Sequence, residues 1–120
     1  MLPARHRLRT RAEFAAAVRS RRCGGPLLIV HCSVPDDPGR PSREASPPRV
    51  GFVVSKAVGN AVVRNRTKRR LRALMAQRMV AVPDGTDVVV RARPVAADAS
   101  HEVLARELDR CLNRCLRSLR

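Results

Sequence analysis

The stretch Lys56–Arg72, with the sequence KAVGNAVVRNRTKRRLR, decides how the rest of the chain is interpreted. It holds seven cationic side chains in seventeen residues and no acidic one. Surface helices usually mix both signs of charge, because an acid one turn before a base stabilises the helix. Since this stretch has no such pairs, a polyanion outside the chain is expected to neutralise its cations.

The same stretch contains the signals of a strand followed by a helix. The apolar run Val50–Val54 has the β-branched and aromatic residues that favour a strand. Asn60 is a good N-cap, because its side-chain oxygen can accept a hydrogen bond from a free backbone N–H. No Gly or Pro occurs from Ala61 until Pro83. The pattern predicts a helix of about five turns beginning after Asn60.

The predicted helix has a narrow apolar stripe and a wide basic surface when its residues are placed about 100° apart. The stripe consists of Val63, Thr67, Leu71 and Leu74. The basic row beside it consists of Arg64, Lys68 and Arg72, and Asn65 and Arg69 continue round the back. The alternative interpretation is a basic face that contacts only solvent. However, the stretch is mostly arginine, and an arginine side chain can donate two hydrogen bonds to the oxygens of one phosphate. The helix is therefore predicted to dock on a core and to present arginines to a nucleic acid.

Four short segments lie in order within the continuous block of residues 50–72: Val50–Lys56, Gly59–Val62, Arg64–Arg66 and Lys68–Arg69. Together they resemble the signature block of the bacterial ribonuclease P protein component, whose name-giving motif is Arg-Asn-Arg. The resemblance implies an α/β (or α+β) two-layer sandwich with a mixed sheet of three to four strands and three helices, similar to the second domain of ribosomal protein S5. It also implies a left-handed crossover around the helix, where general rules favour a right-handed one.

The resemblance also implies a function. Proteins of this family bind a large catalytic RNA and the 5′ leader of precursor tRNA. That RNA, with Mg²⁺ held mainly by its phosphates, hydrolyses the bond that frees the mature tRNA 5′ end. The chain would then be an enzyme only as a subunit of a ribonucleoprotein endoribonuclease, with no catalytic residue and no metal site of its own.

The resemblance also implies which residues form the binding site, by matching positions of this sequence to the family's motif. Contacts to the RNA subunit, or to metal-bridged phosphates near the cleavage site, are expected at Lys56, Asn60, Arg64, Asn65, Arg66, Lys68 and Arg69, with Arg70 and Arg72 added from the same basic stretch. A leader cleft is expected at Phe14, Val18 and His31. Val18 stands where many members have a second aromatic residue, which weakens the case for strong stacking of the leader.

The whole chain fits one RNA-binding domain, residues 1–120. It has 25 Lys and Arg against 10 Asp and Glu, a formal net charge of +15, which favours polyanionic partners. Residues 1–9 are interpreted as a flexible basic arm, and residues 35–48, with five prolines, as a mobile loop. No apolar run reaches the ~18 residues of a membrane helix, so a cytoplasmic protein without a membrane partner is expected.

No catalytic or metal-binding pattern is visible in the chain itself. The three histidines, His6, His31 and His101, have no nucleophile at a known spacing, and the carboxylates do not cluster. The four cysteines lack metal-ligand spacing and are interpreted as buried hydrophobes. A small basic ribosomal protein, or another structural RNA-binding protein without a nuclease role, remains the alternative; nothing supports a helix-turn-helix DNA-binding module.

The remaining elements are predicted from caps, β-branched runs and helical periodicity. A capping box at Thr10–Glu13 predicts a short helix to about Arg19, ended by a turn over Ser20–Gly25. Strands are predicted at Leu27–Val34, Arg49–Ser55 and Thr86–Arg91, the second of them central in the sheet. A last helix starting at Asp98 or Ser100 would bury Leu104, Leu108, Cys111, Cys115 and Leu119. Its exposed arginines, mixed with Glu107 and Asp109, are interpreted as a solvated face.

Overall fold

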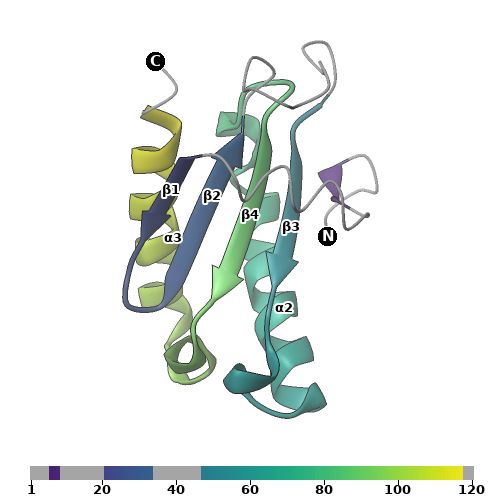
Figure 1. Cartoon of the computed structure of the whole chain (residues 1–120), viewed down its shortest axis with the longest axis vertical. Coiled ribbons are helices and arrows are strands. Elements are labelled where there is room, and N and C mark those ends of the chain that lie inside the picture. The colour runs from purple at the N-terminus through teal and green to yellow at the C-terminus, as the bar shows by residue number, and fades with distance from the viewer. Residues whose placement is uncertain (1–5, 9–20, 34–46, 118–120) are drawn as a thin grey trace.

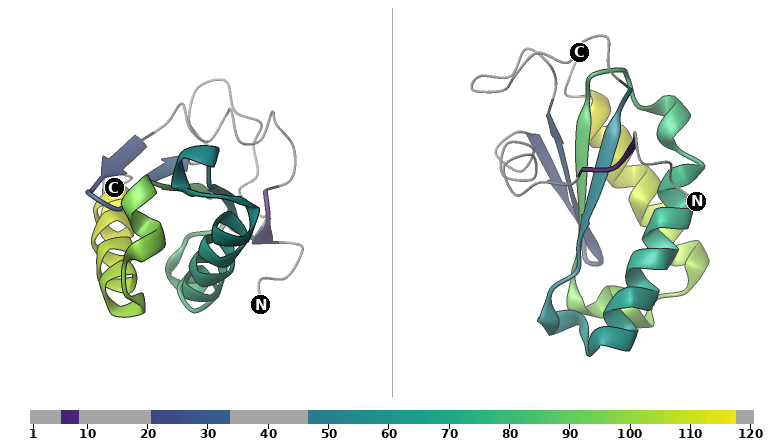
Figure 2. Two further views of the ribbon diagram at one scale, coloured as in Figure 1. Left: turned by 90° about the horizontal axis from the view of Figure 1, so that it is seen from below. Right: turned by 90° about the vertical axis from the view of Figure 1, so that its right-hand side faces the viewer.

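The structure is a computed structural model that describes residues 6–8, 21–33 and 47–117. Four strands form one mixed sheet, and two long helices lie together on one of its faces (Figures 1 and 2). The strands are β1 (Arg21–Gly24), β2 (Leu28–Ser33), β3 (Arg49–Val53) and β4 (Asp87–Ala92). The long helices are α2 (Ala61–Ala76) and α3 (His101–Arg117), and the short 3₁₀ helices are η2 (Lys56–Val58), η3 (Met79–Ala81) and η4 (Pro94–Asp98). The predicted two-layer α+β sandwich is confirmed; the predicted first helix, from Thr10, lies outside the described residues.

The sheet has the strand order β1-β2-β4-β3. The pairs β1–β2 and β2–β4 are antiparallel, whereas β3 and β4 are parallel. The chain leaves β3, runs back along α2 behind the sheet and returns in β4, on the left of β3 when both strands point down (Figure 1). This connection is left-handed, as the resemblance implied and against the general preference.

The core lies between the sheet and the two helices. From β2 and β4 it takes every second residue, since alternate side chains of a strand point to the same face. From the helices it takes the predicted stripes, with Thr67, Leu71, Leu74 and Met75 buried in α2. In α3 the stripe Leu104, Leu108, Cys111 and Cys115 is buried as predicted, and Leu119 lies outside the described residues. The apolar patterns of both helices are thus confirmed.

The prediction that the strand at Arg49–Ser55 is central is wrong, because β3 stands at one end of the strand order. Its outer edge is lined by residues 6–8: Arg7 bridges to Val50, and Leu8 N donates to Val50 O at 3.0 Å. Leu8 is buried and packs with Val53. These contacts cover the apolar face of β3 that suggested a central position. The same contacts hold residues 6–8 against the sheet, so the interpretation of residues 1–9 as a flexible arm does not apply to these three residues.

β1 was not predicted, since the sequence favoured a turn over Ser20–Gly25. In the structure Arg21–Gly24 pairs with β2 along its whole length, and Cys23 faces the core. The turn comes later, closed by Gly25 N donating to Leu28 O at 2.8 Å. A short strand with two arginines and a glycine carries little strand propensity, so its pairing with β2 determines its conformation. The predicted mobile loop falls almost wholly on residues outside those described.

Glu107 is buried, contrary to its assignment to a solvated face of the last helix. Its Oε2 accepts hydrogen bonds from Leu27 N at 2.7 Å and from Leu28 N at 2.6 Å, just after the β1–β2 turn. The side chain is therefore bound to the hairpin, and only 7% of the residue is exposed. A carboxylate that accepts two backbone N–H groups satisfies donors that would otherwise be buried without partners.

Candidate nucleic-acid interface

The start of α2 is fixed by the residues that precede it. Asn60 is the N-cap as predicted, and its Oδ1 accepts from Val63 N at 2.9 Å. Gly59 has a φ of 156°, and a Cβ on it would stand 2.8 Å from Val63 Cγ1. Only glycine therefore fits this approach between the end of η2 and the first turn of α2. Lys56, in η2, is exposed beside that helix N-terminus.

The outer surface of α2 gathers most of the predicted RNA-contacting residues. We call this set the α2 basic face: Lys56, Asn60, Arg64, Asn65, Arg66, Lys68, Arg69 and Arg72. Asn65, Arg66 and Arg69 are exposed, whereas Arg64, Lys68 and Arg72 are half-buried. The half-buried row lies beside the core stripe, where the helix meets β3, so the stems of these side chains are partly held by packing.

No acid neutralises this face within the described part of the chain. The ion pairs among the described residues join Arg49 to Asp87 at 2.8 Å, Arg78 to Asp109 at 2.5 Å and Arg110 to Glu107 at 3.8 Å. None of them involves a cation of the α2 basic face. Uncompensated like charges on one helix repel one another, so an external polyanion is favoured as a ligand.

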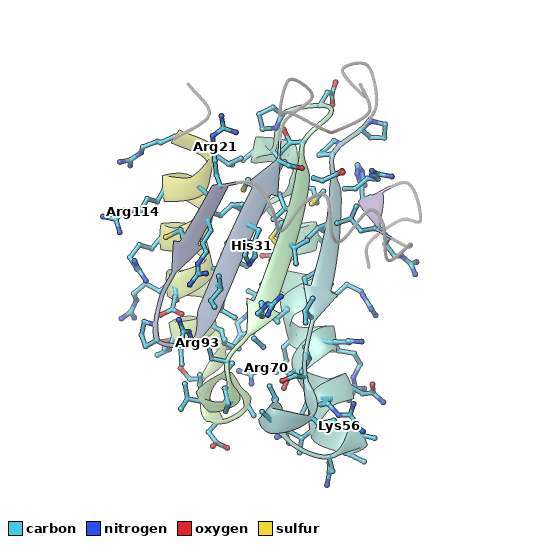
Figure 3. All side chains as sticks on the ribbon, in the orientation of Figure 1. Arg21, His31, Lys56, Arg70, Arg93 and Arg114 are labelled. Atoms are coloured by element: carbon cyan, nitrogen blue, oxygen red, sulfur yellow. The ribbon has the colours of Figure 1, made fainter. Side chains whose placement is uncertain are left out.

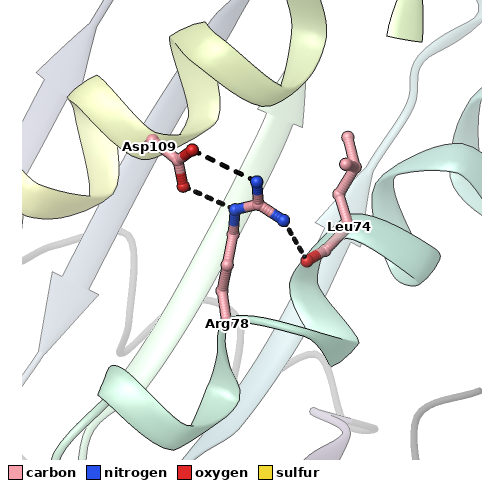
Figure 4. Close-up of polar contacts among 3 residues, drawn as sticks. All are labelled: Leu74, Arg78 and Asp109. Carbon is pink, nitrogen blue, oxygen red and sulfur yellow. Dashed lines mark hydrogen bonds and ion pairs between the residues drawn. The ribbon is translucent and has the colours of Figure 1, made fainter. Parts of the chain in front are cut away.

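Arg78 shows how an arginine next to this face is used differently. It follows α2, and its Nε and Nη2 donate to the two carboxylate oxygens of Asp109 in α3 (Figure 4). Its Nη1 donates to Leu74 O at 2.8 Å, a carbonyl in the last turn of α2. Arg78 thus caps α2 and ties it to α3, and its charge is compensated by the protein itself.

Two hollows border the α2 basic face. The larger, of about 510 Å³, is lined by Val62, Asn65, Lys68, Arg69 and Arg72. The smaller, of about 160 Å³, lies between α2, β3 and the N-terminal segment and is lined by Arg7, Leu8, Val50, Gly51, Phe52, Lys68 and Arg72. Lys68 and Arg72 border both hollows. Within the described part of the chain, the Nε atoms of Arg64 and Arg72 are buried without a hydrogen-bond partner.

Four predicted site residues are not part of the α2 basic face. Arg70 points away from the basic face, and its Nη2 donates to Ala99 O at 2.6 Å, so part of its guanidinium is engaged by the protein. His31 lies on β2 on the sheet face opposite the helices, which we call the front face (Figure 3), and is 6% exposed. Phe14 and Val18 lie outside the described residues, so the predicted leader cleft is seen only at His31.

Sequence reasoning missed one part of this interface. Arg7 and Leu8 were placed in a flexible arm, yet both line the smaller hollow beside Lys68. The parallel bridge from Arg7 to Val50 positions them. An isolated bridge of one residue leaves no periodic signal in a sequence, so only the fold could show it.

The described residues do not fit a protein-held metal ion. Among them, no three His, Cys, Asp or Glu side chains form a group that could hold one. The buried cysteines instead pair as thiols: burial and a hydrogen bond with Cys23 raise the pKa of Cys111 to about 12. A hydrogen bond with Cys115, together with burial, raises the pKa of Cys32. Cys32 and Cys111 are therefore poor nucleophiles, whereas the hydrogen bond with Cys32 lowers the pKa of Cys115.

Comparisons with known proteins identify the family. The profile of the family described as Ribonuclease P matches residues 2–116. The "Ribonuclease P protein component" of Streptomyces bikiniensis is 58% identical over 118 residues, 97% of this chain and 96% of the relative. That of Thermobifida fusca is 52% identical over 114 residues, 93% of this chain and 77% of the relative.

Solved structures agree in fold. The RNase P protein of Staphylococcus aureus matches with a TM-score of 0.73 at 24% identity, covering 90% of this chain and 93% of that one. The RNase P protein of Thermotoga maritima matches with a TM-score of 0.70 at 23% identity, covering 92% and 96%. In both cases the likeness concerns the arrangement of the sheet and its helices.

The fold and the α2 basic face define an α+β protein with one helix whose cations are not neutralised by acids of the described residues. The comparisons make the assignment specific: the chain belongs to the ribonuclease P protein family. It is thus a protein subunit of the endoribonuclease ribonuclease P, which acts in tRNA processing, and its partner is the RNA subunit of that enzyme. No helix among the described residues is long and apolar enough to cross a membrane.

Proposed function

We propose that the α2 basic face binds phosphates of the ribonuclease P RNA and so positions the protein beside the cleavage site of precursor tRNA. The observation that carries this proposal is the absence of internal neutralisation. The face has six Lys and Arg side chains, and no ion pair joins any of them to an acid of the described chain. In this reading the RNA subunit, not the protein, carries out the hydrolysis.

The geometry of α2 suits such a role. The helix is capped by Asn60, anchored by Leu71 and Leu74 in the core, and bound at its end to α3 through Arg78. A helix held at both ends presents its arginines at fixed spacing, so little conformational entropy is lost when they bind phosphates. Arginine adds geometric specificity through paired hydrogen bonds to one phosphate.

The substrate is proposed to be precursor tRNA in the cytoplasm, with its 5′ leader running along the front face of the sheet. His31 is the described member of that predicted cleft. Mg²⁺ is proposed to be held by RNA phosphates, since the described residues supply no cluster of ligands for it. Cations of the α2 basic face would lower the repulsion between neighbouring phosphates in the assembled enzyme.

Reconstitution tests the proposal. The protein, its RNA subunit and a precursor tRNA with a short leader are combined at low Mg²⁺, and 5′ cleavage is measured. Cleavage should depend on the protein and should fall by at least about tenfold in the Arg64→Ala/Arg66→Ala variant, because two phosphate contacts are lost. The Asn113→Ala variant, at an exposed position of α3, should retain activity. Cleavage by the protein without RNA, or equal activity of the α2 variant, would contradict the assignment.

A further inference from the structure

A second group of arginines lies on α3, at the other end of the strand order from α2. We call it the α3 arginine row: Arg106, Arg110, Arg114 and Arg117. At about 100° per residue the four fall within one sector of the helix about 80° wide, on the side away from the buried stripe. All four are exposed, and they extend over about 16 Å of helix.

The two acids that lie between these arginines in the sequence, Glu107 and Asp109, are bound elsewhere. Glu107 lies beneath the β1–β2 turn, where it accepts from Leu27 N and Leu28 N, and among the described residues its one ion pair is with Arg110 at 3.8 Å. Asp109 points towards α2 and binds Arg78 (Figure 4). Within the described chain Arg106, Arg114 and Arg117 form no ion pair. The two acids that made this face look ordinary in the sequence therefore leave most of the row unneutralised, and Glu102, exposed at the start of α3, forms no ion pair with it within the described residues.

The row is connected to the front face of the sheet by further arginines at the β1–β2 turn. Arg22 of β1 is exposed and stands opposite His31 in the strand register, so both side chains belong to the front face. Arg93 Nη2 lies 3.7 Å from the point where a Cβ of Gly24 would stand, which is also on that face. Arg110 Nη2 lies beside Gly25, on the helix side of the turn.

Cations therefore continue from the front face, round the turn and along α3. Figure 3 shows the labelled positions of this route, with Arg93 at the foot of the sheet and Arg114 on the outer side of α3. The route lies on the opposite flank of the molecule from the α2 basic face, because β1 and β3 are the two ends of the sheet. One RNA segment bound on α2 would leave it accessible.

We propose that the α3 arginine row binds the phosphate backbone of the distal part of the precursor tRNA leader, after the leader has crossed the front face. This inference rests on the proposed function. Precursor tRNAs differ in leader sequence, so a contact that serves all of them has to ignore the bases. A row of exposed arginines without aromatic platforms provides such a contact, since phosphates carry no sequence information.

Leader length provides the test. Binding of precursor tRNA to the reconstituted enzyme is measured with a leader of only a few nucleotides and with one long enough to pass the β1–β2 turn. The Arg106→Gln/Arg114→Gln/Arg117→Gln variant should bind the long-leader substrate roughly tenfold more weakly and the short-leader substrate as well as the unaltered protein does. Three lost single-strand contacts should also lower the salt slope for the long leader by about 2.

Three controls separate the possible outcomes. The Arg→Lys triple variant at the same positions should regain most of the affinity, because charge is restored. Asn113→Ala, an exposed neighbour on α3, should change neither substrate. Arg69→Gln, on the α2 basic face, should weaken both substrates alike. Equal losses for both leaders in the α3 variant, loss of RNA subunit binding, or no loss at all would each overturn the proposal. Failure of the unaltered protein to support cleavage would instead reject the proposed function.

Discussion

Arginine has two distinct uses in this molecule, and its partners separate them. Arg49 and Arg78 each donate two hydrogen bonds to one carboxylate and hold elements together. The cations of the α2 basic face have no such partner among the described residues, and the Nε of Arg64 is buried without an acceptor. An unpaired donor in a half-buried place costs free energy unless a ligand satisfies it. The second kind of arginine is thus the kind that marks a binding surface.

The buried thiols predict a pH dependence of stability. The pKa of Cys111 is raised from 9.0 to about 12 by burial and by its hydrogen bond with Cys23. Between these values the unfolded chain releases the thiol proton and the folded chain keeps it. The free energy of unfolding should therefore decrease as pH rises above about 9, by at most about 1.4 kcal/mol per pH unit for this group.

Urea unfolding between pH 8 and about pH 10.5 measures this dependence. Cys111→Ala should be less stable at pH 8, because a small cavity replaces the thiol, but its stability should fall less steeply with pH. The same pH slope in both proteins would show that Cys111 does not hold its proton in the folded state.

At the scale of elements, the β1–β2 hairpin depends on how closely α3 approaches its turn. A Cβ on Gly25 would stand 2.8 Å from Glu107 Cδ and 2.5 Å from Arg110 Nη2. The carboxylate cannot move away without breaking its hydrogen bonds to the hairpin. Gly25→Ala should therefore lower the free energy of unfolding by about 1–3 kcal/mol, measured by urea unfolding.

Gly24 is the matched control for this substitution. A Cβ there would meet only ordinary contacts, at 3.7 Å from Arg93 Nη2 and 4.0 Å from Ile29 Cγ1. Gly24→Ala should change stability by less than about 1 kcal/mol. Similar losses for the two variants would mean that the turn, and not its contact with Glu107, limits the hairpin.

The elements also show what a sequence can and cannot predict here. The position and faces of α2 follow from Asn60 and from the spacing of Thr67, Leu71 and Leu74, because caps and periodicity are local signals. β1 and the burial of Glu107 could not be predicted, since both depend on a contact between α3 and a hairpin about 80 residues away in the chain. The end position of β3 was hidden for the same reason: Leu8 covers it from outside the motif.

Some features of the candidate site could likewise be predicted from the sequence, and others could not. The α2 basic face was predicted almost completely, because a helix with a known start fixes which residues share a side. The hydrogen bond of Arg70 to Ala99 O could not be predicted, since only the fold places that carbonyl within reach. The α3 arginine row was interpreted as an ordinary surface because the sequence cannot tell that Glu107 and Asp109 point elsewhere.

At the scale of the whole molecule, a net charge of +15 on 120 residues opposes a compact fold unless anions are bound. Two cationic surfaces at opposite ends of one sheet would let the protein contact two RNA segments at once. Both surfaces act mainly through phosphates, so their contributions should be strongly salt-dependent and additive when the segments are separate.

The salt dependence of binding to the ribonuclease P RNA tests the central claim most directly. If the six cations of the α2 basic face each neutralise one phosphate, the logarithm of the association constant should fall with the logarithm of salt concentration with a slope of about −4 to −5. Arg64→Ala/Arg66→Ala should reduce the magnitude of that slope by about 1.5 to 2. An affinity that does not respond to salt, or an unchanged slope in the variant, would contradict the account.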